Sequence, residues 1–99
     1  MSRSSVERRL SQVSERLRQL REELAVSAEQ LDHLADAADD ARLRSLVSET
    51  PVADHDHRQA ERHADAMRWH RAKVEAEIAR LERDQDALLD QFVAESKSR

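Results

Sequence analysis

The stretch SETPVAD, from Ser48 to Asp54, decides the fold of this 99-residue chain, because it separates two long helical patterns. It contains Pro51, the only proline in a sequence that has no glycine. Thr50 and Pro51 form a helix start, since threonine is a good N-cap and proline suits the first helical position. We therefore predict that one helix ends near Ser48 and that a second begins at Pro51.

Upstream of this linker the sequence carries an unbroken heptad pattern. Apolar and small residues recur from Val6 to Ala41 at alternating steps of four and three residues, which is the seam of a coiled coil. Ser4 and Glu7 have the spacing of a capping box. The stretch DAADDARLR, residues 36–44, is a candidate break or stutter. The pattern predicts a first helix over about residues 4–48.

Downstream of the linker a second heptad pattern runs from Ala60 to Phe92 with the same alternating steps. It predicts a second helix over about residues 51–94, with the turn at about residues 49–50. Polar residues at seam positions often set the register or the oligomeric state of a coiled coil. Three such positions are Ser27, Arg71 and Gln85.

The short linker makes the two helices antiparallel neighbours. Charge supports this arrangement, because folding at Pro51 lays residues 1–21 (net +4) beside residues 74–99 (net −3) and residues 22–56 (net −8) beside residues 57–73 (net +3). Arg16 with Asp84, and Arg21 with Glu82, are the ion pairs expected across the seam. The predicted fold is an all-α, antiparallel two-helix coiled-coil hairpin that forms a single domain over residues 1–99.

A homodimer is expected, because a lone hairpin buries only one stripe per helix. Towards the turn the seam thins to alanine, and two chains could close this zone as a four-helix bundle. Several large apolar residues near the turn lie off the seam, and they either cap the tip within one chain or belong to the dimer that forms such a bundle. They are Leu43, Leu46, Val47 and Val52.

Composition excludes several classes of protein. There is no cysteine, and therefore no disulfide or thiolate chemistry. No run of 18 apolar residues exists and the N-terminus lacks an apolar signal-peptide core, so we expect a cytoplasmic protein with no membrane partner. Fifteen of the 17 basic residues are arginine, which is typical of a GC-rich genome such as an actinobacterial one.

Metal and catalytic sites are weakly supported. The best metal-ligand candidates are Asp54, His57 and Glu61, which share one face of the second helix. His63 and His70 lie seven residues apart, too far to chelate one ion. No nucleophile stands beside a base and no phosphate-binding loop exists, so we predict a non-enzyme without a cofactor. The net charge of −4 disfavours nucleic-acid binding.

Protein binding fits the residues better. Trp69, the only tryptophan, falls at heptad position f, opposite the seam, and an exposed tryptophan often marks a contact surface. The alternative is a tryptophan that lies across its neighbours on the helix. The candidate contact residues are Trp69, Arg62, His63, His70, Arg71, Leu43, Leu46 and Val47.

Two family resemblances bear on the partner. REELAVSAEQLDHLADAADDARLR, residues 21–44, resembles a helix of the actinobacterial anti-sigma coiled coils that bind cyclic di-GMP through the motif E-x3-S-x2-R-x3-Q-x3-D. Glu23 and Ser27 match this motif, whereas Gln30, Leu34 and Ala38 replace its Arg, Gln and Asp. The resemblance therefore implies a sigma-factor partner but not dinucleotide binding.

The second resemblance is to the coiled-coil hairpin of Gre-type transcript-cleavage factors. The stretch ADHDHRQAERHADAMRWHRAKVEAEIARLE, residues 53–82, is similar to it, with Glu49, Asp54 and Asp56 near the turn. It implies RNA polymerase as a partner, although the second Gre domain has no counterpart here. The sequence thus predicts a regulatory protein-interaction module associated with transcription. The alternatives are a purely structural self-associating bundle and a metal- or nucleotide-responsive sensor.

Overall fold

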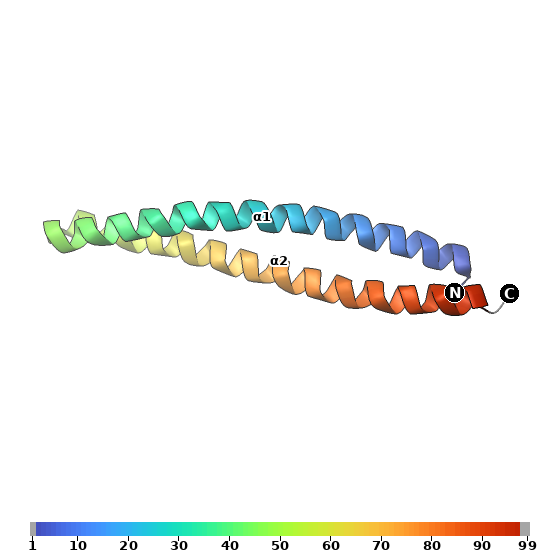
Figure 1. Ribbon diagram of the computed structural model, residues 1–99. Coiled ribbons are helices and arrows are strands. Elements are labelled where there is room, and N and C mark those ends of the chain that lie inside the picture. The colour runs from blue at the N-terminus through green and yellow to red at the C-terminus, as the bar shows by residue number, and fades with distance from the viewer. Residues whose placement is uncertain (1, 98–99) are drawn as a thin grey trace. The chain divides into compact units, whose positions relative to one another are not determined.

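The computed structural model describes residues 2–97 and contains two α-helices, α1 (Arg3–Ser48) and α2 (Pro51–Lys97), joined at Glu49 and Thr50 (Figure 1). No strand occurs among these residues. The predicted all-α antiparallel helical hairpin is confirmed. Helix α1 runs without interruption through residues 36–44, so the candidate break is absent, and α2 continues past the predicted end at residue 94.

The two helix starts differ in how well the sequence predicted them. The amide of Ala53 donates to Thr50 Oγ1 at 3.2 Å, which confirms the predicted cap of α2. At α1 the prediction of Ser4 was wrong, because the amide of Ser5 donates to Ser2 Oγ at 3.3 Å. Ser2, two residues earlier, has the same capping hydroxyl, and Ser4 lies within the first turn of α1.

The turn holds Glu49 in the left-handed region, at φ 51°. Its amide donates to the carbonyl of Ser45 at 3.0 Å, which satisfies one carbonyl of the last turn of α1. Glycine normally occupies this position, because any side chain there clashes with the backbone at a cost of roughly 1–2 kcal/mol. The chain has no glycine to offer.

Replacing Glu49 by glycine is therefore expected to raise the free energy of unfolding by about 0.5–1 kcal/mol, since the relief of this clash outweighs the extra freedom of the unfolded chain. Urea denaturation followed by circular dichroism measures the change. The matched control is Arg44→Gly, an exposed residue one turn inside α1, which should lower stability by about 0.5–1 kcal/mol. A loss of stability in both variants would contradict the assignment.

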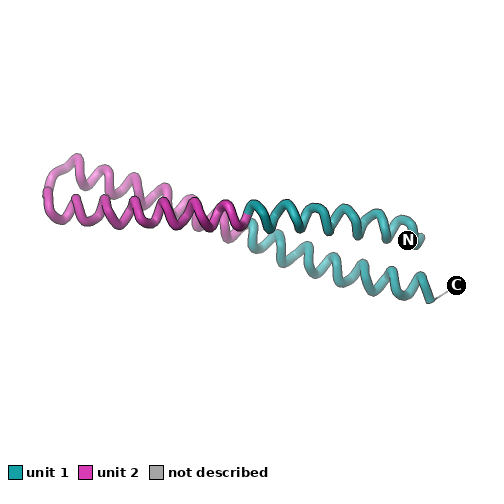
Figure 2. Tube along the Cα trace, turned by 45° about the horizontal axis from the view of Figure 1, so that its top comes forward, with its two compact units in different colours: residues 1–23, 74–99 teal, residues 24–73 magenta. Residues whose placement is uncertain are grey.

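The chain divides into two compact units: unit 1 contains residues 1–23 and 74–99, and unit 2 contains residues 24–73 (Figure 2). Each pairs one segment of α1 with one segment of α2. Unit 1 has a core of branched aliphatic side chains that are at most 8% exposed. These are Val6, Val13, Leu17, Leu20, Val74, Ile78, Leu81 and Leu88.

The core of unit 2 is built from small side chains. Its buried residues are Ser27, Ala38, Ala41 and Ala64, each at most 3% exposed. The larger seam residues of this unit are only half-buried: Leu24, Leu31, Leu34 and Met67. Since the stabilisation from burial scales with apolar area, unit 2 receives much less from its core than unit 1 does.

Polar side chains in and beside the seam of unit 1 link the helices. Gln85 Nε2 donates to Ser14 Oγ at 3.0 Å. Arg16 pairs with Glu77 at 3.4 Å, not with Asp84 as predicted. Glu77 precedes Asp84 by one heptad and lies on the same edge of α2. Heptad spacing alone therefore does not distinguish the two carboxylates as partners of Arg16.

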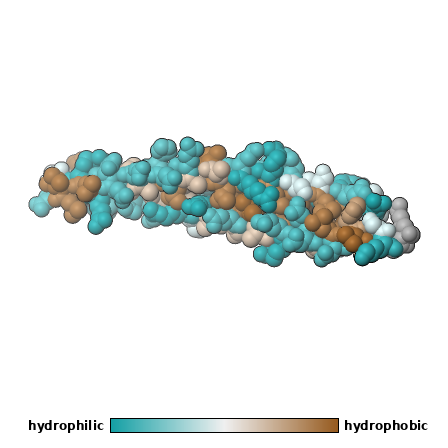
Figure 3. Space-filling model, in the orientation of Figure 1, coloured by the Kyte–Doolittle hydropathy of each residue, from teal (hydrophilic) through white to brown (hydrophobic). Residues whose placement is uncertain are grey.

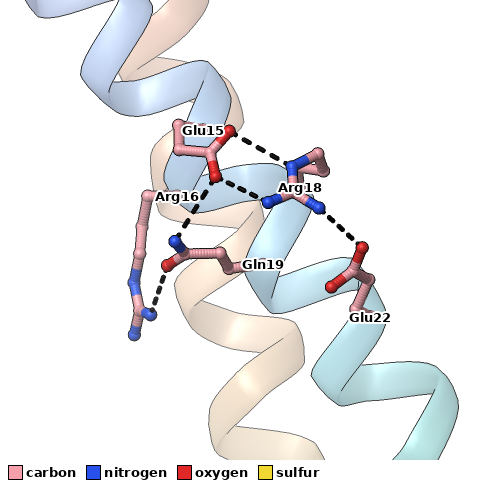
Figure 4. A network of polar contacts seen from close by, with 5 residues as sticks. All are labelled: Glu15, Arg16, Arg18, Gln19 and Glu22. Carbon is pink, nitrogen blue, oxygen red and sulfur yellow. Dashed lines mark hydrogen bonds and ion pairs between the residues drawn. The ribbon is translucent and has the colours of Figure 1, made fainter.

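A polar network also runs along α1 in unit 1 (Figure 4). Arg18 contacts Glu15 at 2.6 Å and Glu22 at 2.7 Å. The hydrogen bond and charge of Arg18 lower the pKa of Glu15 below its usual value. All these groups are exposed, so water screens the pairs and they add little to stability.

Candidate functional site

Four large apolar side chains gather where α1 turns into α2, and we name them the tip cluster: Leu43, Leu46, Val47 and Val52. They are 62%, 64%, 85% and 71% exposed, in that order. Figure 3 shows apolar surface at the turn end of the molecule. The possibility that these residues cap the tip within one chain is wrong, because such high exposure means that no other part of the chain covers them.

The tip cluster lies on a well-defined backbone. Ser45 Oγ donates to the carboxylate of Asp54, which ties the last turn of α1 to the first turn of α2. A shallow groove beside the cluster is lined by Asp39, Arg42, Leu43 and Leu46. The tip therefore offers apolar side chains with charged groups at their border, which is the usual composition of a protein-contact patch.

Trp69 lies outside the seam, as its heptad position predicts, and is 67% exposed. The Nζ atom of Lys73 sits 4.3 Å from the centroid of a Trp69 ring. Because the two residues are one helical turn apart, this cation–π contact holds the indole along the outer face of α2. Trp69 thus contacts a neighbour on its own helix, Lys73, as the alternative prediction stated. Most of its side chain is nevertheless exposed to solvent.

The other predicted contact residues near Trp69 differ in exposure. Arg62 and His63 are exposed, and His70 is half-buried. Arg71 occupies a seam position but is exposed, because its long side chain can carry the guanidinium out of the helix interface. Their role in binding stays a prediction.

The three candidate metal ligands are not brought together. Over residues 2–97, no group of three or more histidine, aspartate or glutamate side chains is placed to hold an ion. Asp54 accepts the hydrogen bond of Ser45. His57 is a seam residue, and its Nδ1 is buried without a hydrogen-bond partner, whereas Asp54 and Glu61 occupy the flanking position e.

Sequence reasoning missed a second surface of unit 2, which we name the uncharged side. It consists of heptad positions c and g of both helices, which share one flank of an antiparallel pair. A shallow groove on this side is lined by Gln30, His33, Leu34 and Met67. The signal was available, because none of these positions holds an Asp, Glu, Lys or Arg between Val26 and Ala37 or between Gln59 and His70.

Comparison with known proteins supplies no relative: no family model, no curated protein and no solved structure matches the chain. Neither helix, over the part of the chain that the structure describes, combines the length and the apolar character needed to cross a bilayer. The interpretation of the two surfaces therefore rests on their own chemistry.

Proposed function

We infer that this chain is a non-enzymatic protein-interaction module and that the tip cluster is its main contact surface. One observation carries the proposal: Leu43, Leu46, Val47 and Val52 are 62–85% exposed, and all four flank the short turn between α1 and α2. Isolated exposed leucines are common, but a group of large apolar side chains costs solubility unless a partner covers it.

Trp69 forms a second contact in the proposal. Tryptophan is among the residues that contribute most to binding energy at interfaces, because one rigid side chain buries a large area. Lys73 already orders this indole. Less conformational entropy is therefore lost when a partner covers it.

The finer proposal concerns the partner. The resemblances of residues 21–44 and 53–82 favour a component of the transcription machinery, either RNA polymerase or a sigma factor. Such a partner would place the protein in the cytoplasm and give it a regulatory role. To test this point, purified polymerase or sigma factor is titrated into the protein. A change in the fluorescence of Trp69, the only tryptophan of this chain, would report binding.

Affinity capture from a lysate of the native host, followed by mass spectrometry, tests the tip cluster. The double variant Leu46→Ser, Val47→Ser should lose a specific partner while its melting temperature stays within a few degrees of the parent, because both side chains are already exposed. Trp69→Ala should weaken the same capture and likewise leave helicity unchanged.

The matched control is Leu89→Ser, Val93→Ser, a leucine and a valine that are 46% and 49% exposed in unit 1. This variant should capture the same partner as the parent chain. If all three variants retain the same captured proteins, the tip cluster is not the contact surface and the proposal fails.

A second candidate function is a purely structural bundle that assembles only with itself. The uncharged side of unit 2 favours it, because a flank without formal charge is suited to helix packing. Self-association alone does not exclude partner binding, since the tip cluster and the zone from Val26 to Ala37 occupy different parts of unit 2; the purely structural function differs in that no other protein binds.

A further inference from the structure

We propose that the uncharged side of unit 2 binds a second copy of this chain, with both turns at the same end of a four-helix bundle. The surface differs from the tip cluster, so the proposal specifies the self-association of the second candidate function and does not depend on partner binding at the tip. Three observations carry it: the contrast between the two flanks of unit 2, the small core of this unit and the distribution of charge along its helices.

The first observation is the contrast between the flanks. On the uncharged side, positions c and g are Val26, Gln30, His33, Ala37, Gln59, His63, Ala66 and His70, none of which is Asp, Glu, Lys or Arg. Over the same span the opposite flank, positions b and e, holds Asp32, Glu61, Asp65 and Arg68. In a chain with 38% charged residues, such a one-sided absence of charge is expected where a helix face is buried.

The second observation is the core of unit 2, which buries only serine and alanine completely. Leu34 and Met67 remain half-buried and line the groove that opens on the uncharged side. A second copy laid on this side would cover both residues, and alanines at positions 37 and 66 allow the helices to approach closely. The additional buried area supplies what the single hairpin lacks.

The third observation, charge, selects the orientation of the second copy. Residues 24–40 of α1 hold five acidic and no basic side chains, whereas residues 57–73 of α2 hold five basic and two acidic ones. A two-fold axis along the hairpin sets each acidic segment against the basic segment of the other copy, and every neighbouring helix pair is antiparallel. A two-fold axis across the hairpin sets acid against acid and is disfavoured.

This orientation specifies individual contacts between the copies. Asp36 lies 13 residues before Glu49 and Arg62 lies 12 residues after Thr50, so the two residues are level along the hairpin. Both occupy position f, on opposite outer edges of one chain. They cannot pair within one copy, but they border the same intermolecular groove in the dimer, which would hold two Asp36–Arg62 pairs.

Sedimentation equilibrium at low salt tests which flank of unit 2 forms the dimer interface. Wild-type protein should have the mass of a dimer, and Ala66→Glu should weaken association more than 100-fold, because each dimer would bury two carboxylates. The matched control is Ala72→Glu, an exposed alanine at position b on the opposite flank, which should leave the mass unchanged. Ala37→Glu and its control Ala25→Glu repeat the comparison on α1.

The charge pairs test the orientation. Asp36→Arg alone and Arg62→Asp alone should each weaken association roughly tenfold, because both edges then carry like charges. An equimolar mixture of the two variants should recover dimers, since each mixed dimer holds two complementary pairs. Circular dichroism confirms that every variant remains helical.

Several outcomes would overturn the proposal. A monomeric wild-type chain at high micromolar concentration removes the dimer. Dissociation by Ala72→Glu but not by Ala66→Glu assigns the dimer to the other flank. Tighter association of Asp36→Arg indicates that α1 packs on α1, and thus that the turns lie at opposite ends. None of these results bears on partner capture by the tip cluster, so the two proposals can fail separately.

Discussion

Replacing Leu17 by alanine is expected to lower the free energy of unfolding by about 3 kcal/mol, within the range of 2–5 kcal/mol for a buried leucine. Leu17 is 0% exposed in the core of unit 1, so the variant loses the transfer energy of three carbons and leaves a cavity between the helices. A domain of this size has a total stability of only about 5–10 kcal/mol. The loss should lower the melting temperature by more than about 10 °C.

Urea denaturation at a fixed protein concentration measures this change, because association would otherwise shift the midpoint. The matched control is Leu89→Ala, a leucine of the same unit that is 46% exposed. It should cost less than about 1 kcal/mol, since much of its side chain already meets water. Equal losses in the two variants would mean that the seam of unit 1 is not packed as described.

Replacing Ala64 by aspartate is expected to have an effect of similar size on unit 2. Ala64 is 0% exposed between the helices, and the short carboxylate of aspartate cannot reach water from that position. An unpaired buried charge costs about 3–5 kcal/mol. Because unit 2 has few large buried side chains to offset this loss, its helical segments should unfold first.

Amide hydrogen exchange separates the two units in this variant. Amides of residues 24–73 should lose most of their protection, while those near Leu17 and Leu81 should keep more of it. Ala72→Asp, an exposed alanine eight residues along α2, is the control and should cost only the lower helix propensity of aspartate, about 0.5 kcal/mol. If Ala64→Asp changes protection equally throughout both units, the two units do not differ in stability and unfold together.

The helices, their pairing and the inward residues were predictable from spacing. Alternating steps of four and three between Val6 and Ala41, and again between Ala60 and Phe92, leave one apolar stripe on each helix. Thr50 and Pro51 mark the start of α2 because capping is a local interaction between residues close in sequence. The cap of α1 was assigned to the wrong serine, since Ser2 and Ser4 present the same hydroxyl to the same turn.

The surfaces were less predictable, because exposure depends on what the second helix covers. Position f indicated that Trp69 points outward, but its contact with Lys73 depends on rotamers that spacing does not specify. The sequence left the apolar residues of the tip open between an internal cap and a contact surface. Only their exposure, up to 85% at Val47, excludes the internal cap.

What the sequence alone determined is the helical hairpin, because heptad spacing, the N-cap at Thr50 and the absence of glycine within the helices are local properties. Tertiary structure decided which residues are available to partners. In the folded chain Arg16 pairs with Glu77 and not with Asp84, His57 lies at the helix interface, and the tip cluster is exposed. These outcomes depend on distances between residues far apart in the chain, which periodicity within one helix does not encode.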